Sequence, residues 1–144
     1  MRISQSSFLK TLLAVAAITL ATAACAAAAT LPMESSPEIP AAEGRVHMKL
    51  ARNQNTQIDL VVKHLAPPDR IAPGTSVFIV WVRGLPLGSK PQSMGALRVN
   101  KDLGAKMRFV TALKAFDLFL TCEAIQTVVE PSGKELLPVH YAGE

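Results

Sequence analysis

The most densely apolar run after the first thirty residues is Ser76–Arg83, with the sequence Ser-Val-Phe-Ile-Val-Trp-Val-Arg. β-Branched and aromatic side chains fit the pleated surface of a sheet better than they fit a helix. Pro73-Gly74 precedes the run and Gly84 follows it, so residues that favour turns bound it on both sides. We therefore expect a central strand. Its tryptophan, Trp81, should anchor the core, because an indole can bury about 150–250 Å².

The chain after residue 45 repeats this alternation of short apolar runs and turn signals. Period-two alternation, which is typical of strands, is clearest in Thr56–Leu65 and Phe116–Glu123. The predicted strands are Val46–Ala51, Thr56–Leu65, Ser76–Arg83, Gly95–Asn100, Ala105–Leu113, Phe116–Glu123 and Leu136–Tyr141. Seven short strands separated by turn residues predict an all-β sandwich or barrel.

The connections carry their own predictions. Lys101-Asp102-Leu103-Gly104 is expected to close a hairpin, with Gly104 in the left-handed conformation. Glu130-Pro131-Ser132-Gly133 suits a type I turn. Lys106–Phe116 has an alternative as a helix, because its apolar residues recur at roughly helical spacing. The glycine before this stretch and the strand pattern after it favour a strand.

The first 29 residues have the pattern of an export signal. Arg2 and Lys10 precede an uncharged stretch, Thr11–Ala24, that ends in small residues. The alternative is a single membrane-spanning helix. The uncharged run to Ala29 covers 19 residues, near the lower end of the roughly 17–25 that a span needs. The pattern therefore favours export.

Cys25 offers a membrane tether. Thr22-Ala23-Ala24-Cys25 resembles the lipobox of bacterial lipoproteins, in which a cysteine after small residues becomes the lipidated N-terminus. That motif usually has an aliphatic residue where this chain has Thr22. The alternative is ordinary signal-peptidase cleavage, for example after Ala23 or Ala29. Two alternatives therefore remain open: a lipoprotein tethered through Cys25, and an exported protein without a lipid.

Residues 30–44 are rich in proline, glutamate and serine and contain few large apolar residues. Such a stretch gains little from burial, so we expect an extended or disordered linker. The predicted organisation is an export segment at residues 1–29, a linker at 30–44 and a sandwich domain at 45–144.

The charge pattern argues against a nucleic-acid partner. The formal net charge is +4, and Arg2 and Lys10 of the export segment supply two of the positive charges. Nucleic-acid binding proteins usually have runs of basic residues and aromatic residues that stack on bases. This chain has no basic run and few aromatic residues. Four basic residues flank the predicted hairpin, and we interpret them as a solvated face rather than a site for a polyanion. They are Lys101, Lys106, Arg108 and Lys114.

Groups that carry chemistry are sparse. His47, His64 and His140 lack the spacing of metal ligands and are expected to be solvated. Cys122 shares the predicted inward face of its strand, which indicates a buried, inert thiol. A Cys25–Cys122 disulfide would require Cys25 to be retained without a lipid.

Asp59 and Asp117 are expected to be surface acids on their strands. Paired carboxylates act as general acid and base only when they lie close together. The sequence does not show whether Asp59 and Asp117 are close. The chain has no Gly-x-Ser-x-Gly or phosphate-loop motif. We therefore predict no enzyme activity, no cofactor and no metal site.

Several segments resemble the C-terminal, extracytoplasmic domain of anti-sigma-K factors. The resemblance covers about Thr56 to Tyr141. It is carried by Phe78-Ile79-Val80-Trp81-Val82, Gly95-Ala96-Leu97-Arg98-Val99, Phe116–Glu123 with Thr121-Cys122-Glu123, and Glu130-Pro131-Ser132-Gly133. It implies an Ig-like antiparallel β-sandwich of about seven strands and an extracytoplasmic location. The sigma-binding domain and membrane helix that precede this module in the family have no recognisable counterpart here.

Three functional hypotheses follow. The leading one is an exported, non-enzymatic β-sandwich module of the bacterial envelope. It would act by binding an envelope protein of unknown identity or as a structural element, with a membrane tether through Cys25 as one form of attachment. The second is a sensor or regulator related to anti-sigma factors that works with a separate partner. The third is an envelope metal-binding protein or enzyme that uses the histidines.

Overall fold

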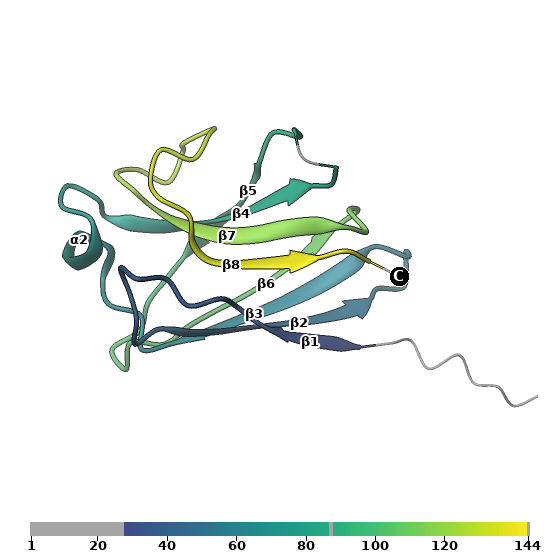
Figure 1. Cartoon of the computed structure of the whole chain (residues 1–144), viewed down its shortest axis with the longest axis horizontal. Coiled ribbons are helices and arrows are strands. Elements are labelled where there is room, and N and C mark those ends of the chain that lie inside the picture. Colours follow the sequence, from purple (N-terminus) through teal and green to yellow (C-terminus); the bar gives the residue numbers. More distant parts are fainter. Residues whose placement is uncertain (1–27, 87, 144) are drawn as a thin grey trace, which may run out of the picture.

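Two four-stranded antiparallel sheets packed face to face make up the protein (Figure 1). The computed structural model describes residues 28–86 and 88–143. Sheet A has the strand order β1-β2-β3-β6 and sheet B the order β5-β4-β7-β8. The elements are β1 (Ala29–Pro32), β2 (Glu43–Leu50), β3 (Thr56–Lys63), α2 (Pro68–Ile71), β4 (Val77–Gly84), β5 (Gln92–Leu97), β6 (Ala105–Thr111), β7 (Phe116–Glu123) and β8 (Leu136–Tyr141).

The predicted all-β sandwich is confirmed. All seven predicted strands are present, with bounds within three residues of those expected, and β1 is an eighth. The stretch with a helical alternative is the strand β6. The pair β3–β6 belongs to sheet A, where β6 is an edge strand, and the pair β4–β7 forms the centre of sheet B. They correspond to the B–E and C–F pairs of an immunoglobulin-like sandwich, with β8 in the place of strand G.

The main core fills the space between the sheets. Successive strand residues point to opposite faces, so alternate residues of each strand enter this core. Its fully buried members include Val46, Ile58, Leu60, Phe78, Val80, Val82, Phe116, Leu118 and Leu120. Cys122 belongs to the same cluster, so its predicted inward position is confirmed.

Trp81 is buried as predicted, with 0% of its surface exposed, but not where we expected it. It packs with Ile79 and Phe119 in a second cluster on the outer face of sheet B. The even-numbered residues Phe78, Val80 and Val82 face the other sheet instead. The expectation that Trp81 anchors the main core, between the two sheets, is therefore wrong.

Residues 30–44 are a correction to the predicted linker. Within them, β1 pairs with β2, with Leu31 opposite Val46. Met33, Ile39 and Ala42 are buried in the main core. The amide of Leu137 donates a hydrogen bond to Ser36 Oγ at 2.8 Å. The sandwich therefore includes this segment: its few apolar side chains are spaced so that they cover one edge of the core.

The predicted hairpin between β5 and β6 is also corrected. These strands lie in different sheets, and an isolated bridge pairs Val99, in the connection after β5, with Ala105 at the start of β6. In the connection, Asn100 Oδ1 accepts hydrogen bonds from the amides of Asp102 and Gly104, each at 2.9 Å. The left-handed residue is Leu103, with φ 57°, and not the expected Gly104.

The export segment and Cys25 lie outside the described residues, apart from the last two positions of the predicted segment. Among the residues described, no helix combines the length and the apolar character needed to cross a membrane.

Candidate functional site

Three connections meet at one end of the sandwich. They are residues 64–76 between β3 and β4, 98–104 between β5 and β6, and 124–135 between β7 and β8. The register Val62↔Ala105 places the end of β3 beside the start of β6. The register Val77↔Glu123 places the start of β4 beside the end of β7. Figure 1 shows α2 at this end, and the C-terminus and the start of β1 at the other. In immunoglobulin-like domains, loops at one end of a rigid sandwich are a common binding site.

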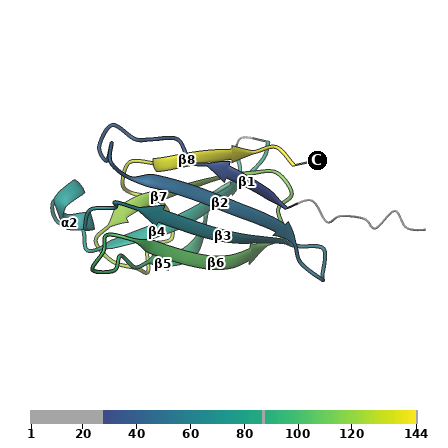
Figure 2. The same ribbon diagram turned by 90° about the horizontal axis from the view of Figure 1, so that it is seen from below.

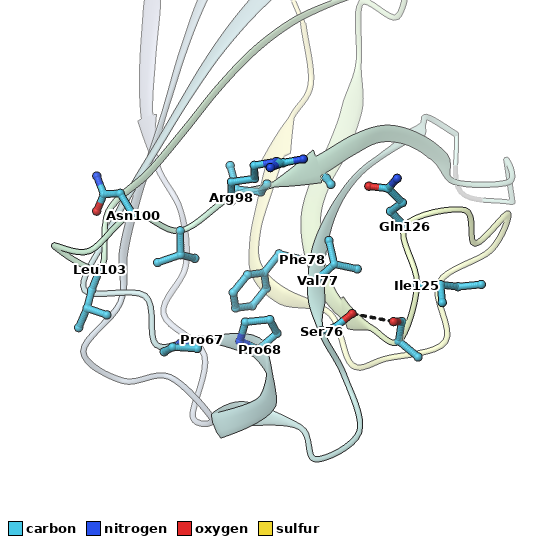
Figure 3. A pocket seen from close by; sticks show the side chains of 14 residues that line it. Pro67, Pro68, Ser76, Val77, Phe78, Arg98, Asn100, Leu103, Ile125 and Gln126 are labelled. Carbon is cyan, nitrogen blue, oxygen red and sulfur yellow. Dashed lines mark hydrogen bonds between the residues drawn. The ribbon is translucent and has the colours of Figure 1, made fainter.

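A pocket of about 670 Å³ lies between these connections (Figure 3). Its volume falls in the range of roughly 300–1,000 Å³ found for ligand sites. Phe78 and Pro68 lie close together in its middle, while Arg98 and Gln126 lie along one side. No carboxylate, imidazole or thiol is among its described lining residues. The pocket therefore offers apolar contact, amide hydrogen bonds and one cation.

Hydrogen bonds hold the walls of this pocket in place. Ser76 Oγ donates to the carbonyl of Ala124 at 2.7 Å, which ties the start of β4 to the end of β7. The amide of Leu65 donates to the carbonyl of Leu103 at 2.9 Å. Thr75 Oγ1 lies within hydrogen-bond distance of two carbonyls of the α2 turn. The site is thus formed before any partner arrives, which lowers the entropy cost of binding.

Two large apolar side chains are exposed at the pocket. Leu103 is 41% exposed and Ile125 is 60% exposed. The left-handed backbone of Leu103 is uncommon for a bulky residue, and it is maintained here by the Asn100 turn. Apolar groups gathered in this way at a preformed hollow are typical of interaction sites.

One wall of the pocket depends on a buried carboxylate. Glu123, with 0% exposure, accepts hydrogen bonds from Thr121 Oγ1 at 2.6 Å, from the amides of Ser132 and Gly133 at 2.9 and 3.3 Å, and from the hydroxyl of Ser132. Burial alone would raise the pKa of Glu123, but the hydrogen bonds outweigh it and hold that pKa below its ordinary value. These bonds replace the predicted type I turn and fix residues 124–135 over sheet B.

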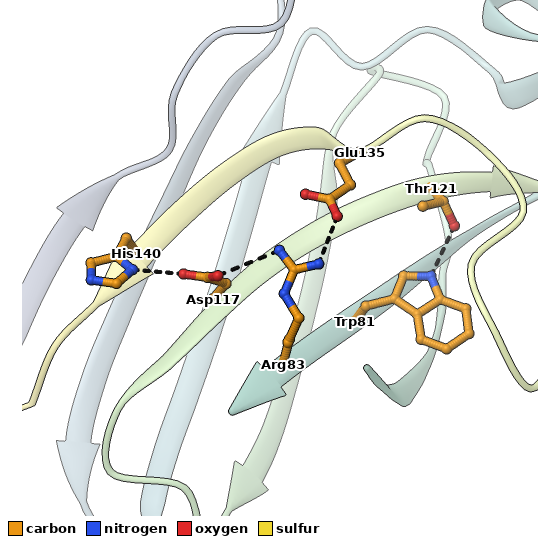
Figure 4. Close-up of polar contacts among 6 residues, drawn as sticks. All are labelled: Trp81, Arg83, Asp117, Thr121, Glu135 and His140. Carbon is orange, nitrogen blue, oxygen red and sulfur yellow. Dashed lines mark hydrogen bonds and ion pairs between the residues drawn. The ribbon is translucent and has the colours of Figure 1, made fainter. Parts of the chain in front are cut away.

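A charged cluster on the outer face of sheet B is the second candidate (Figure 4). Arg83 donates to Glu135 at 2.8 Å and to Asp117 at 3.4 Å. Asp117 in turn is 2.7 Å from Nδ1 of His140. The hydrogen bond to Glu135 is the largest effect raising the pKa of Arg83. The cluster links three strands of this sheet and the connection before β8, so Asp117 is an ion-pair partner rather than a solvated acid.

A histidine–carboxylate pair of this kind can activate a nucleophile only when a hydroxyl or thiol lies in hydrogen-bond reach of the imidazole. Asp117 is the partner found for His140 in the described structure. The guanidinium of Arg83 lies 5.1 Å from the ring centroid of Phe119, and the same face carries the bond from Trp81 Nε1 to Thr121 at 2.8 Å (Figure 4). We interpret the cluster as structural.

The structure separates the three histidines. His47 is on the outer face of sheet A, where Nδ1 is hydrogen-bonded to Thr30 at 2.6 Å, and His140 is on the outer face of sheet B. His64 lies in the connection after β3. No group of three or more potential metal-ligating side chains is found in the part of the chain that the structure describes.

Cys122 is buried, and burial raises its pKa to about 11. A thiol with so high a pKa is almost wholly protonated at neutral pH and reacts slowly. The disulfide alternative involves Cys25, which lies outside the described residues.

The four basic residues around the expected hairpin are not one cluster. Lys106 and Arg108 share the outer face of sheet A, while Lys101 and Lys114 lie in turns at opposite ends of β6. Arg108 is hydrogen-bonded to Asp59, and this contact lowers the pKa of Asp59. Sequence reasoning found neither the pocket nor the role of Glu123. The signal for Glu123 was its place at the end of an apolar strand, in Thr121-Cys122-Glu123.

In comparisons with known proteins, no family model and no curated protein matches this chain.

Proposed function

We propose that this chain is an exported, non-enzymatic β-sandwich module of the bacterial envelope that binds another envelope protein. The binding site is the pocket between the connections 64–76, 98–104 and 124–135. The observation that carries the proposal is the pair of exposed apolar side chains, Leu103 and Ile125, held at a preformed pocket.

The chemistry of the pocket defines the partner. Burying an apolar side chain of this size is worth about 1.5–3 kcal/mol, so covering Leu103 and Ile125 favours association. Arg98 is exposed beside them and can pair with a carboxylate. The expected partner presents an apolar side chain next to an acidic residue.

The position of the pocket fits a tethered module. The described chain starts near the end of the sandwich that lies away from the pocket (Figure 1). A chain attached to a membrane through Cys25 would therefore point the pocket away from its anchor. The uncharged segment Thr11–Ala24 supports export.

The proposal is tested by recovering partners of the full chain from envelope fractions. Leu103→Asp and Ile125→Asp place a charge in the apolar contact, and both should abolish recovery of a specific partner. Leu50→Asp is the control, because Leu50 is 53% exposed at the opposite end of the sandwich. The proposal fails if all chains recover the same proteins, or if the purified chain turns over a defined substrate.

A regulator related to anti-sigma factors is a second candidate. The segments that resemble that family supply Thr121, Glu123, Ser132 and Gly133, and these residues form the network that holds the pocket wall. Because the residues of this network lie in the segments that resemble the family, the network favours a related module that works with a separate partner. If deletion of the gene leaves sigma-dependent transcription unchanged, this candidate is excluded.

A further inference from the structure

The outer face of sheet A carries a surplus of positive charge. Five exposed basic side chains point out of this face, and we refer to them together as the basic face: Arg45, Lys49, Lys63, Lys106 and Arg108. Glu43 and Asp59 are the two acidic residues on the same face. Figure 2 shows β2, β3 and β6 side by side, with no other described segment across them.

The strand register leaves part of this charge uncompensated. Asp59 binds Arg108, and Glu43 lies opposite Lys63. Arg45 and Lys106, by contrast, both lie opposite Val61, one on each side of it. Lys49 lies opposite Gln57.

The two outer faces of the sandwich therefore differ. The outer face of sheet B is covered by the connection 124–135, from which Val128 packs against the cluster of Trp81 and Phe119. The basic face is open and is built on three paired strands. An open surface with one dominant sign of charge attracts a surface of the opposite sign.

The length of the N-terminal tether favours a membrane as that surface. β1, an edge strand of sheet A, begins at Ala29, only four residues after Cys25. Four residues span at most about 14 Å, and residues 30–44 add no spacer because they belong to the sandwich. An anchor at Cys25 would hold sheet A within that distance of the lipid headgroups.

We propose that the basic face docks onto an anionic phospholipid bilayer and acts as a second attachment beside the N-terminal tether. Each basic residue close to an anionic leaflet contributes about 1 kcal/mol. A lipid anchor combined with a basic surface gives more stable attachment than an acyl chain alone. This docking surface is separate from the pocket that binds protein.

The test uses the full chain with Cys25→Ala, so that acylation makes no contribution. Its binding to vesicles of phosphatidylcholine containing about a third phosphatidylglycerol is compared with binding to phosphatidylcholine alone. We expect stronger binding to the anionic vesicles, and we expect this preference to disappear at about 0.5 M salt, where the charges are screened.

Arg45→Gln combined with Lys106→Gln should weaken binding to anionic vesicles by at least about tenfold. Lys49→Gln with Lys63→Gln is a second pair on the same face. The matched control is Arg52→Gln with Lys101→Gln, which removes the same charge from exposed turns at the two ends of the sandwich and should leave binding unchanged. Unfolding midpoints verify that each variant folds. Equal binding to both kinds of vesicle, or equal losses in face and control pairs, would overturn the proposal.

Discussion

Among single residues, Trp81 shows what an apolar strand leaves undetermined. Its burial could be predicted from the composition of β4, because so large a side chain is seldom left in water. Its face could not, because Ile79 and Trp81 on one side are as apolar as Val80 and Val82 on the other. The distant connection 124–135 decides the matter by covering the outer side.

Replacing Trp81 by alanine should lower the free energy of unfolding by roughly 3–5 kcal/mol, because it empties a fully buried site. Trp81→Phe is the matched variant. It keeps most of the apolar contact and removes the hydrogen bond to Thr121, worth about 1 kcal/mol. Denaturant unfolding followed by circular dichroism measures both. A loss below about 1 kcal/mol for the alanine variant is typical of surface positions and would contradict the buried position.

Glu123 is a residue whose structural role could not be predicted from the sequence. It continues the alternation of β7 on the side of Asp117 and Thr121, where we predicted Asp117 to be a surface acid. Four donors from Thr121, Ser132 and Gly133 allow the carboxylate to be buried instead. Those donors lie up to ten residues further along the chain, so local pattern could not reveal them.

Glu123→Gln should reduce the free energy of unfolding by about 1.5–3 kcal/mol near neutral pH, because it replaces a charged acceptor by a weaker one. The folded-state pKa of Glu123 lies below its ordinary value of 4.5. The stability that it contributes is therefore full above that value and is lost as the pH falls through the folded-state pKa. The difference in free energy of unfolding between the native protein and the Glu123→Gln variant should therefore become smaller as the pH falls.

Denaturant unfolding at a series of pH values from about 7 to about 3 measures this narrowing. Glu130→Gln is the control, since Glu130 forms an exposed pair with Lys90 and such pairs contribute little. A constant difference between native protein and the Glu123 variant over the whole range would mean that the carboxylate charge is not what holds the connection.

At the scale of elements, the segment 30–44 shows the limit of reasoning from composition. Its prolines and glutamates predict an ill-packed spacer, but the spacing of Met33, Ile39 and Ala42 lets it cover the edge of the core. The prediction of a hairpin between β5 and β6 was wrong for a related reason. Turn residues specify a reversal of the chain, whereas pairing with β3 and β4 decides which sheet each strand joins.

Ile39→Ala separates the two views of this segment. We expect it to lower the free energy of unfolding by about 2–5 kcal/mol, as for other buried aliphatic residues. Ile125→Ala makes the same change at an exposed position and should stay within about 0.5 kcal/mol of the native protein. Equal, small effects at both positions would restore the interpretation of residues 30–44 as a linker.

At the scale of the whole molecule, the sandwich could be predicted because period-two alternation recurs in short strands between turn residues. The pocket could not, since its walls come from connections that only the pairing registers bring together. The basic face could be predicted in part, because Lys106 and Arg108 were expected on one side of their strand. Their neighbours Arg45, Lys49 and Lys63 join them only through the pairing of β2, β3 and β6.

The central claim is that the end of the sandwich with the pocket contacts a protein partner. A photo-crosslinking residue placed at Ile125 in living cells tests it most directly, with the same residue at Leu50 as the control at the other end. We expect one discrete crosslinked product from position 125, lost when Leu103→Asp is added, and none from position 50. Products of equal yield and size from both positions, or none from position 125, would contradict the claim.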